Sequence, residues 1–190
     1  MPTVRRPRTI AGMVNHGALN RMAAIDYTVM RVPVERTFVL RKAVLRPYLA
    51  ADEPYSCPDD HLPETVALAA LTGADEVIGV ARITPERPPF ETSEERSWRL
   101  RGMAARPEVR NMGVGSAVLR GLISHISGRG GGIIWCNARV SARGLYGRCG
   151  LRQWGEVWEE PHIGPHVVMW RQVSPASAAH GPGAAVVPGV

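Results

Sequence analysis

The residues with the clearest chemical potential form a glycine-containing turn, Arg110 to Ser116, with the sequence RNMGVGS. Apolar residues at helical spacing follow it, so the turn would stand at the N-terminus of a helix. The first N–H groups of a helix lack an intrahelical acceptor, and the helix dipole adds positive potential there. Because such a turn can hold phosphates, the sequence predicts a site for a phosphate-bearing ligand.

The segment around this turn is strongly basic. Between Glu108 and Glu156 the chain has seven arginines and no acidic residue, a local charge of +7 against +6 for the whole chain. The basic residues are almost all arginine, and aromatic residues are not interleaved with them, so nucleic acid is an improbable partner. We expect most of these arginines to be solvated, with one or two available to a further phosphate: Arg120, Arg129, Arg143, Arg148 and Arg152.

Length and composition favour one globular domain in the cytoplasm. The chain has 190 residues, of which 45% are hydrophobic and 21% charged, ordinary values for such a domain. No apolar run approaches the ~18 residues of a membrane span. The cysteines, Cys57, Cys136 and Cys149, are odd in number and lack metal-ligand spacing, so we expect reduced thiols and no metal ion.

Periodicity predicts alternating strands and helices. The expected helices are 35–49, 113–127 and 141–148, and the expected strands are 27–34, 65–71, 76–84, 98–105, 133–135, 151–159 and 166–172. In the first helix, these apolar residues should face the core: Phe38, Val39, Ala43, Leu45 and Leu49. In the second, Val114, Val118 and Leu122 should face the core while Ser116 faces away. Gly102 predicts a bulge or a close backbone approach within its strand.

This order of elements predicts an α/β (α+β) fold with a mixed, mostly antiparallel sheet. One parallel crossover should run through helix 113–127. We expect residues 25–173 to form the domain, with a disordered basic arm at 1–24. The uncharged Pro/Gly/Ala-rich segment 174–190 should be a disordered tail.

Two familiar phosphate-binding turns do not fit residues 110–116. A nucleotide P-loop needs a lysine after its last glycine, and this turn has none. A dinucleotide-binding turn needs an apolar strand leading into the first glycine, a third glycine, and an acid about 20 residues later. Val118 stands in place of that glycine, and the next acid is Glu156.

The turn closely resembles the acetyl-CoA signature of the GCN5-related N-acetyltransferase (GNAT) superfamily, in which Arg110, Gly113 and Gly115 match the pattern. The MAARPEVR before it resembles the family's strand-to-loop entry, and LYGRCGL at 145–151 resembles the family's tyrosine motif. NAR at 137–139 and IGPH at 163–166 look like one bacterial branch. The resemblance covers about residues 27–172 and implies an acyl-CoA N-acyltransferase fold with a splayed parallel strand pair.

The resemblance implies these roles for the cofactor-binding residues. The backbone of Met103 and Ala104 would pair with the pantetheine arm of acetyl-CoA. The diphosphate would lie on the turn, where glycines permit close approach, with the Ser116 hydroxyl as a further donor; the residues involved are Arg110, Asn111, Met112, Gly113, Val114, Gly115 and Ser116. Arg139 stands where many members have an asparagine that touches the cofactor. Tyr146 would protonate the departing CoA thiolate.

The acceptor amine must lose a proton before or during attack. Four residues on or between the last two strands are candidate bases: Glu156, Glu159, His162 and His166. His166 is favoured because imidazole titrates near neutral pH. The acidic loop 50–64 lies where the family shapes its acceptor site, and its five carboxylates either attract a cationic amine or are merely solvated.

The sequence thus predicts acetyl transfer from acetyl-CoA to a small-molecule or peptide amine, by direct attack in a ternary complex. A non-catalytic acyl-CoA-binding module on the same fold is the first alternative, and a nucleic-acid-binding protein is the second. No membrane partner is expected. The strand containing Trp154 and Trp158 either pairs with a second copy, giving a homodimer, or packs within the chain.

Overall fold

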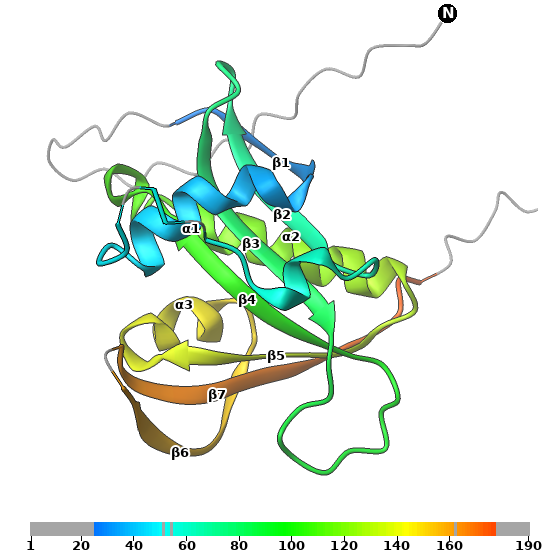
Figure 1. The fold of residues 1–190 in the computed structure, drawn as a ribbon. Coiled ribbons are helices and arrows are strands. Elements are labelled where there is room, and N and C mark those ends of the chain that lie inside the picture. The colour runs from blue at the N-terminus through cyan, green and yellow to red at the C-terminus, as the bar shows by residue number, and fades with distance from the viewer. Residues whose placement is uncertain (1–24, 51, 54, 162, 178–190) are drawn as a thin grey trace, which may run out of the picture.

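The computed structural model describes residues 25–50, 52, 53, 55–161 and 163–177. Its centre is a seven-stranded sheet in the order β1-β2-β3-β4-β5-β7-β6, with helices on both faces (Figure 1). The strands are β1 (Tyr27–Val32), β2 (Val66–Thr72), β3 (Val77–Pro85), β4 (Ser97–Ala105), β5 (Gly132–Arg139), β6 (Arg152–Glu160) and β7 (Gly164–Val173).

In the described residues, three α-helices and four short 3₁₀ turns accompany the sheet. The α-helices are α1 (Phe38–Leu45), α2 (Val114–Gly128) and α3 (Arg143–Arg148). The 3₁₀ turns are η1 (Val34–Thr37), η2 (Pro58–His61), η3 (Pro107–Val109) and η4 (Val140–Ala142). In Figure 1, α1 lies in front of the sheet and α2 behind it. The predicted β-hairpin is confirmed as β2 and β3.

The sheet confirms the predicted mixed topology. Every neighbouring pair is antiparallel except β4 and β5, which run parallel and are connected through α2. Their pairing ends early, with Arg99 opposite Trp135 as the last registered pair. Beyond it the two strands diverge, and α3 is visible in the widening angle between them (Figure 1).

A β-bulge in β4 confirms the expectation for Gly102. Arg101 lies opposite Arg82 but Ala104 lies opposite Val80, so β4 has one extra residue here. Gly102 has a φ of +63°, and a Cβ on it would lie 2.7 Å from Nε of Arg41. The bulge resets the alternation of β4, so that Ala104 packs on the α1 side of the sheet.

Helix α2 supplies the centre of the larger core, as its period predicts. Val118, Leu119, Leu122 and Ile126 are completely buried. The expectation that Ser116 faces away is wrong, since this residue is only 9% exposed. Its first-turn position brings it against the C-terminal end of α3, where the Cys149 thiol lies 3.9 Å from its carbonyl oxygen.

The predicted orientation of the first helix is also wrong. The α-helix ends at Leu45 and Val39 is 82% exposed, whereas Leu40 and Arg41 are buried. Hydrophobic periodicity cannot predict a buried arginine, because its burial depends on an acidic residue that is distant in the sequence. Asp60 is that acid, and its carboxylate lies 2.8 Å from Nη1 of Arg41.

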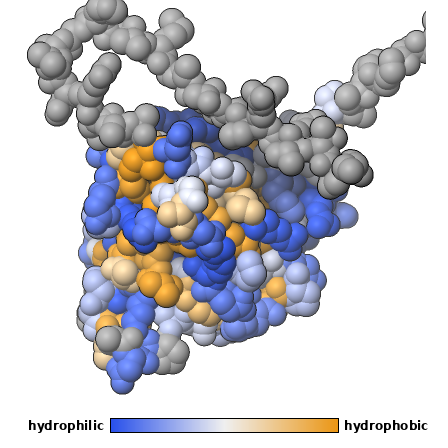
Figure 2. Space-filling model, turned by 90° about the horizontal axis from the view of Figure 1, so that it is seen from above, coloured by the Kyte–Doolittle hydropathy of each residue, from blue (hydrophilic) through white to orange (hydrophobic). Residues whose placement is uncertain are grey.

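The surface around α1 mixes apolar and polar residues. Figure 2 shows hydrophobic surface bordered by hydrophilic residues on the face seen from above, and Met30 and Val39 are among the exposed large apolar side chains. Within the part of the chain that the structure describes, no helix is both long and apolar enough to cross a membrane.

The predicted N-terminal arm, 1–24, lies outside the described residues, as does most of the predicted tail. The first tail residues, 174–177, are described, and they are tied to the end of α2. Ser127 donates its hydroxyl to the Ser174 carbonyl at 2.8 Å, and Ala176 N–H donates to the Ser127 carbonyl at 2.9 Å. The domain therefore extends slightly beyond residue 173.

Candidate active site

The N-terminus of α2 presents unpaired backbone donors, as the turn predicts. Among the described residues, no acceptor lies within hydrogen-bonding distance of the N–H groups at positions 113–116, and no side chain caps the helix. Asn111 and Gly113 take φ values of +63° and +85°. These left-handed residues turn the chain sharply before the helix begins. The result is a concentration of N–H donors at the positive end of a 15-residue helix.

The two signature glycines serve different purposes. A Cβ at Gly113 would meet nothing within 4 Å, so its positive φ is what favours glycine there. A Cβ at Gly115 would lie 3.0 Å from Cδ1 of Leu145 and 3.4 Å from Cε of Met103. Gly115 therefore also lets α2 pack against α3 and β4, while the close approach of a ligand to both glycines stays a prediction.

The same contacts bring three predicted segments together. The start of α2, the α3 residue next to Tyr146 and the β4 residue Met103 all meet around Gly115. Met103 and Ala104 lie on β4 beyond Arg99, where the edge facing β5 has no registered partner. That edge is free to pair with an extended, amide-bearing ligand, in the manner of β-strand addition.

Arg110 and Asn111 are exposed and Met112 is half-buried, all just before the helix, whereas Val114 is buried in the core. Val114 can thus contribute its N–H but not its side chain. The arginines predicted to be solvated are all exposed: Arg120, Arg129, Arg143, Arg148 and Arg152.

Tyr146 lies on α3 and is 7% exposed. Burial raises the pKa of its hydroxyl well above the ordinary value, the thiols of Cys136 and Cys149 add to the rise, and the charge of Arg139 opposes it. The hydroxyl therefore remains protonated at neutral pH and is a hydrogen-bond donor.

Cys136 lies beside Tyr146, although no sequence pattern marked it as a functional residue. It is the first β5 residue beyond the last pair with β4, and its thiol interacts with the Tyr146 hydroxyl. Burial raises the pKa of Cys136 to about 12, with that interaction opposing the rise. The thiol is therefore neutral at neutral pH. All three cysteines are free, in agreement with the prediction of reduced thiols.

His166 and Tyr146 lie on opposite faces of the sheet. Tyr146 packs with Cys136, Ala138 and Met169 on the α2 side. Strand alternation in β7 places His166 on the opposite face from Val167 and Met169. Its ring lies 6.0 Å from that of Trp158. The two predicted catalytic residues are therefore not in contact. One ligand could reach both faces of the sheet where β4 and β5 diverge.

The His166 ring has a defined hydrogen bond. Its Nδ1 lies 2.7 Å from the Gly164 carbonyl oxygen, which can only accept, so Nδ1 carries the proton and Nε2 of the neutral ring has a free lone pair. His166 is directly opposite Arg139 in the β5–β7 register. This is the C-terminal end of β5, beyond the last residue that pairs with β4. Of the other candidate bases, Glu156 and Glu159 are exposed on β6, and His162 lies outside the described residues.

A chain of ion pairs crosses the α1 face and ends at the point where β4 and β5 separate. Asp60 pairs with Arg41 and Arg82, and Asp59 with Arg82 and Arg101. Glu86 then pairs with both Arg101 and Arg99. Sequence analysis missed this network. The one available signal is the pair of arginines at 99 and 101, which strand alternation places on one face of β4.

The network corrects one expectation about the acidic loop. Asp59 and Asp60 belong to structural ion pairs, and Asp60 is 2% exposed, so these two carboxylates are not available to attract a cationic amine. Burial alone would raise the pKa of Asp59, but the Arg82 hydrogen bond and the charges of Arg82 and Arg101 hold it below the ordinary value. Asp52, Glu53 and Glu64 remain exposed.

A pocket lies elsewhere, where β1 ends and β2 begins, and is lined by residues including Arg31, Pro33 and Thr65. None of its lining residues belongs to the turn, β4 or α3. Among the described residues, no cluster of three or more His, Cys, Asp or Glu side chains is arranged to hold a metal ion.

Comparison with known proteins gives a consistent result. The model of the acetyltransferase (GNAT) family matches residues 35–151. A Bacillus subtilis (strain 168) protein named "Uncharacterized N-acetyltransferase YitI" is 30% identical over 143 residues, which cover 75% of this chain and 94% of that protein.

Solved structures share the fold. Escherichia coli ElaA has a TM-score of 0.61 at 18% identity, with 77% of this chain and 99% of ElaA covered. An aminoglycoside 6′-N-acetyltransferase complexed with coenzyme A has a TM-score of 0.59 at 15% identity, with 80% and 99% covered. Taken with the splayed β4–β5 pair and the bare α2 N-terminus, the family match shows that this chain belongs to the GNAT family of acetyltransferases.

Proposed function

We propose that the protein transfers the acetyl group of acetyl-CoA to an amine by direct attack in a ternary complex. The observation that carries the proposal is the divergence of β4 and β5 after Arg99, with unpaired donors at the start of α2 and Tyr146 on one side and His166 on the other. Acetyl-CoA is a substrate here, and the site fits its diphosphate and its amide-bearing arm.

Each end of that substrate has a suitable partner. The diphosphate would accept hydrogen bonds from the N–H groups at 113–116, where the helix dipole favours negative charge. The pantetheine amides would extend the sheet along β4 at Met103 and Ala104. This path leads to Tyr146, which shares the contacts around Gly115 through its neighbour Leu145.

The chemical step requires two proton transfers. The amine nitrogen forms a bond to the thioester carbonyl carbon while the carbon–sulfur bond breaks. The departing sulfur takes the Tyr146 hydroxyl proton, and the amine proton passes to Nε2 of His166. Exchange with solvent then returns a proton to Tyr146 and removes one from His166, so that both regain their starting state.

Initial-rate measurements over a panel of amines test the proposal. Free thiol release should depend on both acetyl-CoA and amine, with intersecting double-reciprocal lines, as a ternary complex requires. Parallel lines would indicate an acetyl-enzyme instead. Saturable CoA binding without amine-dependent thiol release would favour the non-catalytic acyl-CoA-binding module.

The assignment of the base has its own test. His166→Asn keeps a side-chain donor near the Gly164 carbonyl but removes Nε2, so kcat/KM should fall about 100-fold or more at neutral pH. The loss should shrink at a pH where the amine is already neutral. If Glu159→Gln gives this behaviour and His166→Asn does not, the base lies on β6.

A further inference from the structure

The ion-pair network on the α1 face has more positive than negative charge. Its members are Arg41, Asp60, Arg82, Asp59, Arg101, Glu86 and Arg99. Four guanidinium groups face three carboxylates, so one positive charge has no counterpart within the network. An uncompensated charge is costly in the interior and is stable only where solvent or a ligand can reach it.

The two ends of the network differ in accessibility. At the closed end, the side chains of Arg41, Asp60 and Arg82 are at most 1% exposed. At the open end, the Arg99 and Arg101 side chains are 21% and 29% exposed. The excess positive charge can therefore be met by a ligand only at Arg99 and Arg101.

Arg99 is held rigidly but has unused donors. Its guanidinium carbon lies 4.6 Å from the centre of the Trp135 ring, and its Nη1 donates to Glu86. Trp135 in turn donates its Nε1 proton to the Glu86 carbonyl at 3.0 Å. Among the described residues, Nη1 is the one Arg99 nitrogen with an acceptor, and Nε is buried without one.

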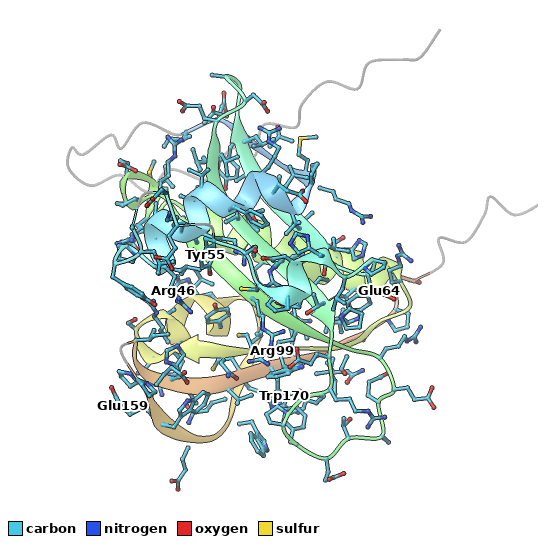
Figure 3. All side chains as sticks on the ribbon, in the orientation of Figure 1. Arg46, Tyr55, Glu64, Arg99, Glu159 and Trp170 are labelled. Atoms are coloured by element: carbon cyan, nitrogen blue, oxygen red, sulfur yellow. The ribbon has the colours of Figure 1, made fainter. Side chains whose placement is uncertain are left out.

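These arginines stand where an acceptor would enter. Arg99 and Trp135 form the last pair before β4 and β5 separate, and strand alternation puts Arg101 on the same face. Figure 3 shows Arg99 between the β4 and β5 ribbons, with Trp170 of β7 below it and Tyr55 above it on the α1 side. His166 also lies on this face, in β7 opposite the free end of β5.

On these grounds we propose that Arg99 and Arg101 bind a carboxylate of the acceptor, so that the substrates are amines that also carry a carboxylate, as amino acids do. A planar guanidinium group with open donors, as at Arg99, suits a carboxylate geometrically, and Trp135 and Glu86 already hold Arg99 in place. Arg101, whose Nη1 and Nη2 already donate to Asp59 and Glu86, adds its positive charge beside it. This proposal rests on the proposed acetyl transfer, whose acceptor it specifies, and replaces the cationic amine as the expected substrate class.

Binding and turnover can be measured separately on the same compounds. The first arm titrates CoA-saturated protein with N-acetyl amino acids and with their primary amides, which differ only in the carboxylate. We expect the acids to bind about 10-fold more tightly or better. The second arm compares kcat/KM for free amino acids with that for the corresponding amino acid amides, followed by thiol release.

Variants identify the residues responsible. Arg99→Gln and Arg101→Gln should each bring the acid-to-amide ratio close to one, while CoA affinity stays unchanged. Arg106→Gln is the matched control, because Arg106 also lies near β4 and also has an acidic partner, Glu76 at 3.6 Å, but stands outside the network. Arg101→Lys keeps the positive charge and so controls for a folding defect in Arg101→Gln. It should retain part of the preference for acids over amides.

The outcomes are distinct. Preferential binding of the acids without any turnover would support the carboxylate site and contradict acetyl transfer. Turnover of amides as fast as acids, with equal binding, would overturn the carboxylate site and leave acetyl transfer standing. A preference for acids that survives in both glutamine variants would also overturn it, because the carboxylate would then be bound elsewhere.

Discussion

Near the point where β4 and β5 separate, the two faces of the sheet carry different kinds of chemical groups. Behind the sheet, α2 and α3 present bare N–H groups and a buried tyrosine within an apolar core. In front of it, α1 and the acidic loop cover the sheet with linked ion pairs. The rear face therefore presents positive potential from backbone N–H groups. The front face presents charged side chains that hold one another in place through ion pairs.

The difference has a consequence for robustness. Backbone donors at a helix terminus persist through most side-chain substitutions, because the helix itself supplies them. A network of buried charges does not, because removing one member leaves another charge unpaired in the interior. We therefore expect substitutions behind the sheet to alter chemistry, and substitutions in front of it to alter stability or acceptor choice.

Tyr146→Phe should have the largest effect on activity. Removing the hydroxyl takes away the proton donor to the departing thiolate, so kcat should fall about 100-fold or more, with CoA affinity preserved. Thiol release and calorimetric CoA titration measure the two quantities. Tyr48→Phe is the control, because Tyr48 is 64% exposed; equal losses in both variants would contradict a role for Tyr146 in catalysis.

Asp60→Asn should have the largest effect on stability. It removes the negative charge that pairs with both Arg41 and Arg82, and breaking such a buried pair costs about 3–5 kcal/mol. Asp75→Asn removes a carboxylate that is paired with Arg36 at 2.9 Å but is 71% exposed, and should cost less than about 1 kcal/mol. Urea denaturation compares the two; similar losses would mean that the network contributes little.

Gly113→Ala should have a smaller effect, directed at ligand binding. The positive φ of Gly113 would cost an alanine about 1–2 kcal/mol, and relaxation of that strain would tilt the donors away from the ligand. CoA affinity should weaken measurably. Gly128→Ala, at the other end of α2 and with open space around it, should leave CoA affinity unchanged, and a matching loss there would argue against binding at the N-terminus.

Asp59 should give the smallest effect, visible as a change in pH dependence. Its pKa in the folded protein is lower than its ordinary value of 3.8, so its contribution to stability is complete above that value and disappears as pH falls through the folded pKa. The difference in melting temperature between wild type and Asp59→Asn should therefore be constant near neutral pH and vanish in strong acid. A difference that grows on acidification would contradict the ion pairing.

The features of the rear face could be predicted because they are local in sequence. The turn, the apolar period of α2 and the tyrosine motif each lie within a few residues, and backbone geometry follows directly from glycine positions such as Gly113. The mostly antiparallel sheet with a single parallel pair followed from the order of the elements along the chain. Local patterns even predicted the bulge at Gly102, although not that the Arg41 side chain packs against it.

The features of the front face could not be predicted because their partners are far apart. Arg41 lies 19 residues from Asp60, and Arg101 lies 42 residues from Asp59. Hydrophobic periodicity treats each of these side chains as a surface residue, so it turned α1 the wrong way and left the acidic loop free. Only the tertiary fold shows that these charged side chains pair with one another.

The most direct test is a titration of isotope-labelled protein with CoA, followed by the backbone amide signals in NMR spectra. If the CoA diphosphate binds at the start of α2, the amides at positions 113–116 should shift saturably and together, by more than those of the exposed turn at Gly73 between β2 and β3. Saturable binding that moves other amides and leaves positions 113–116 unchanged would contradict binding at this turn.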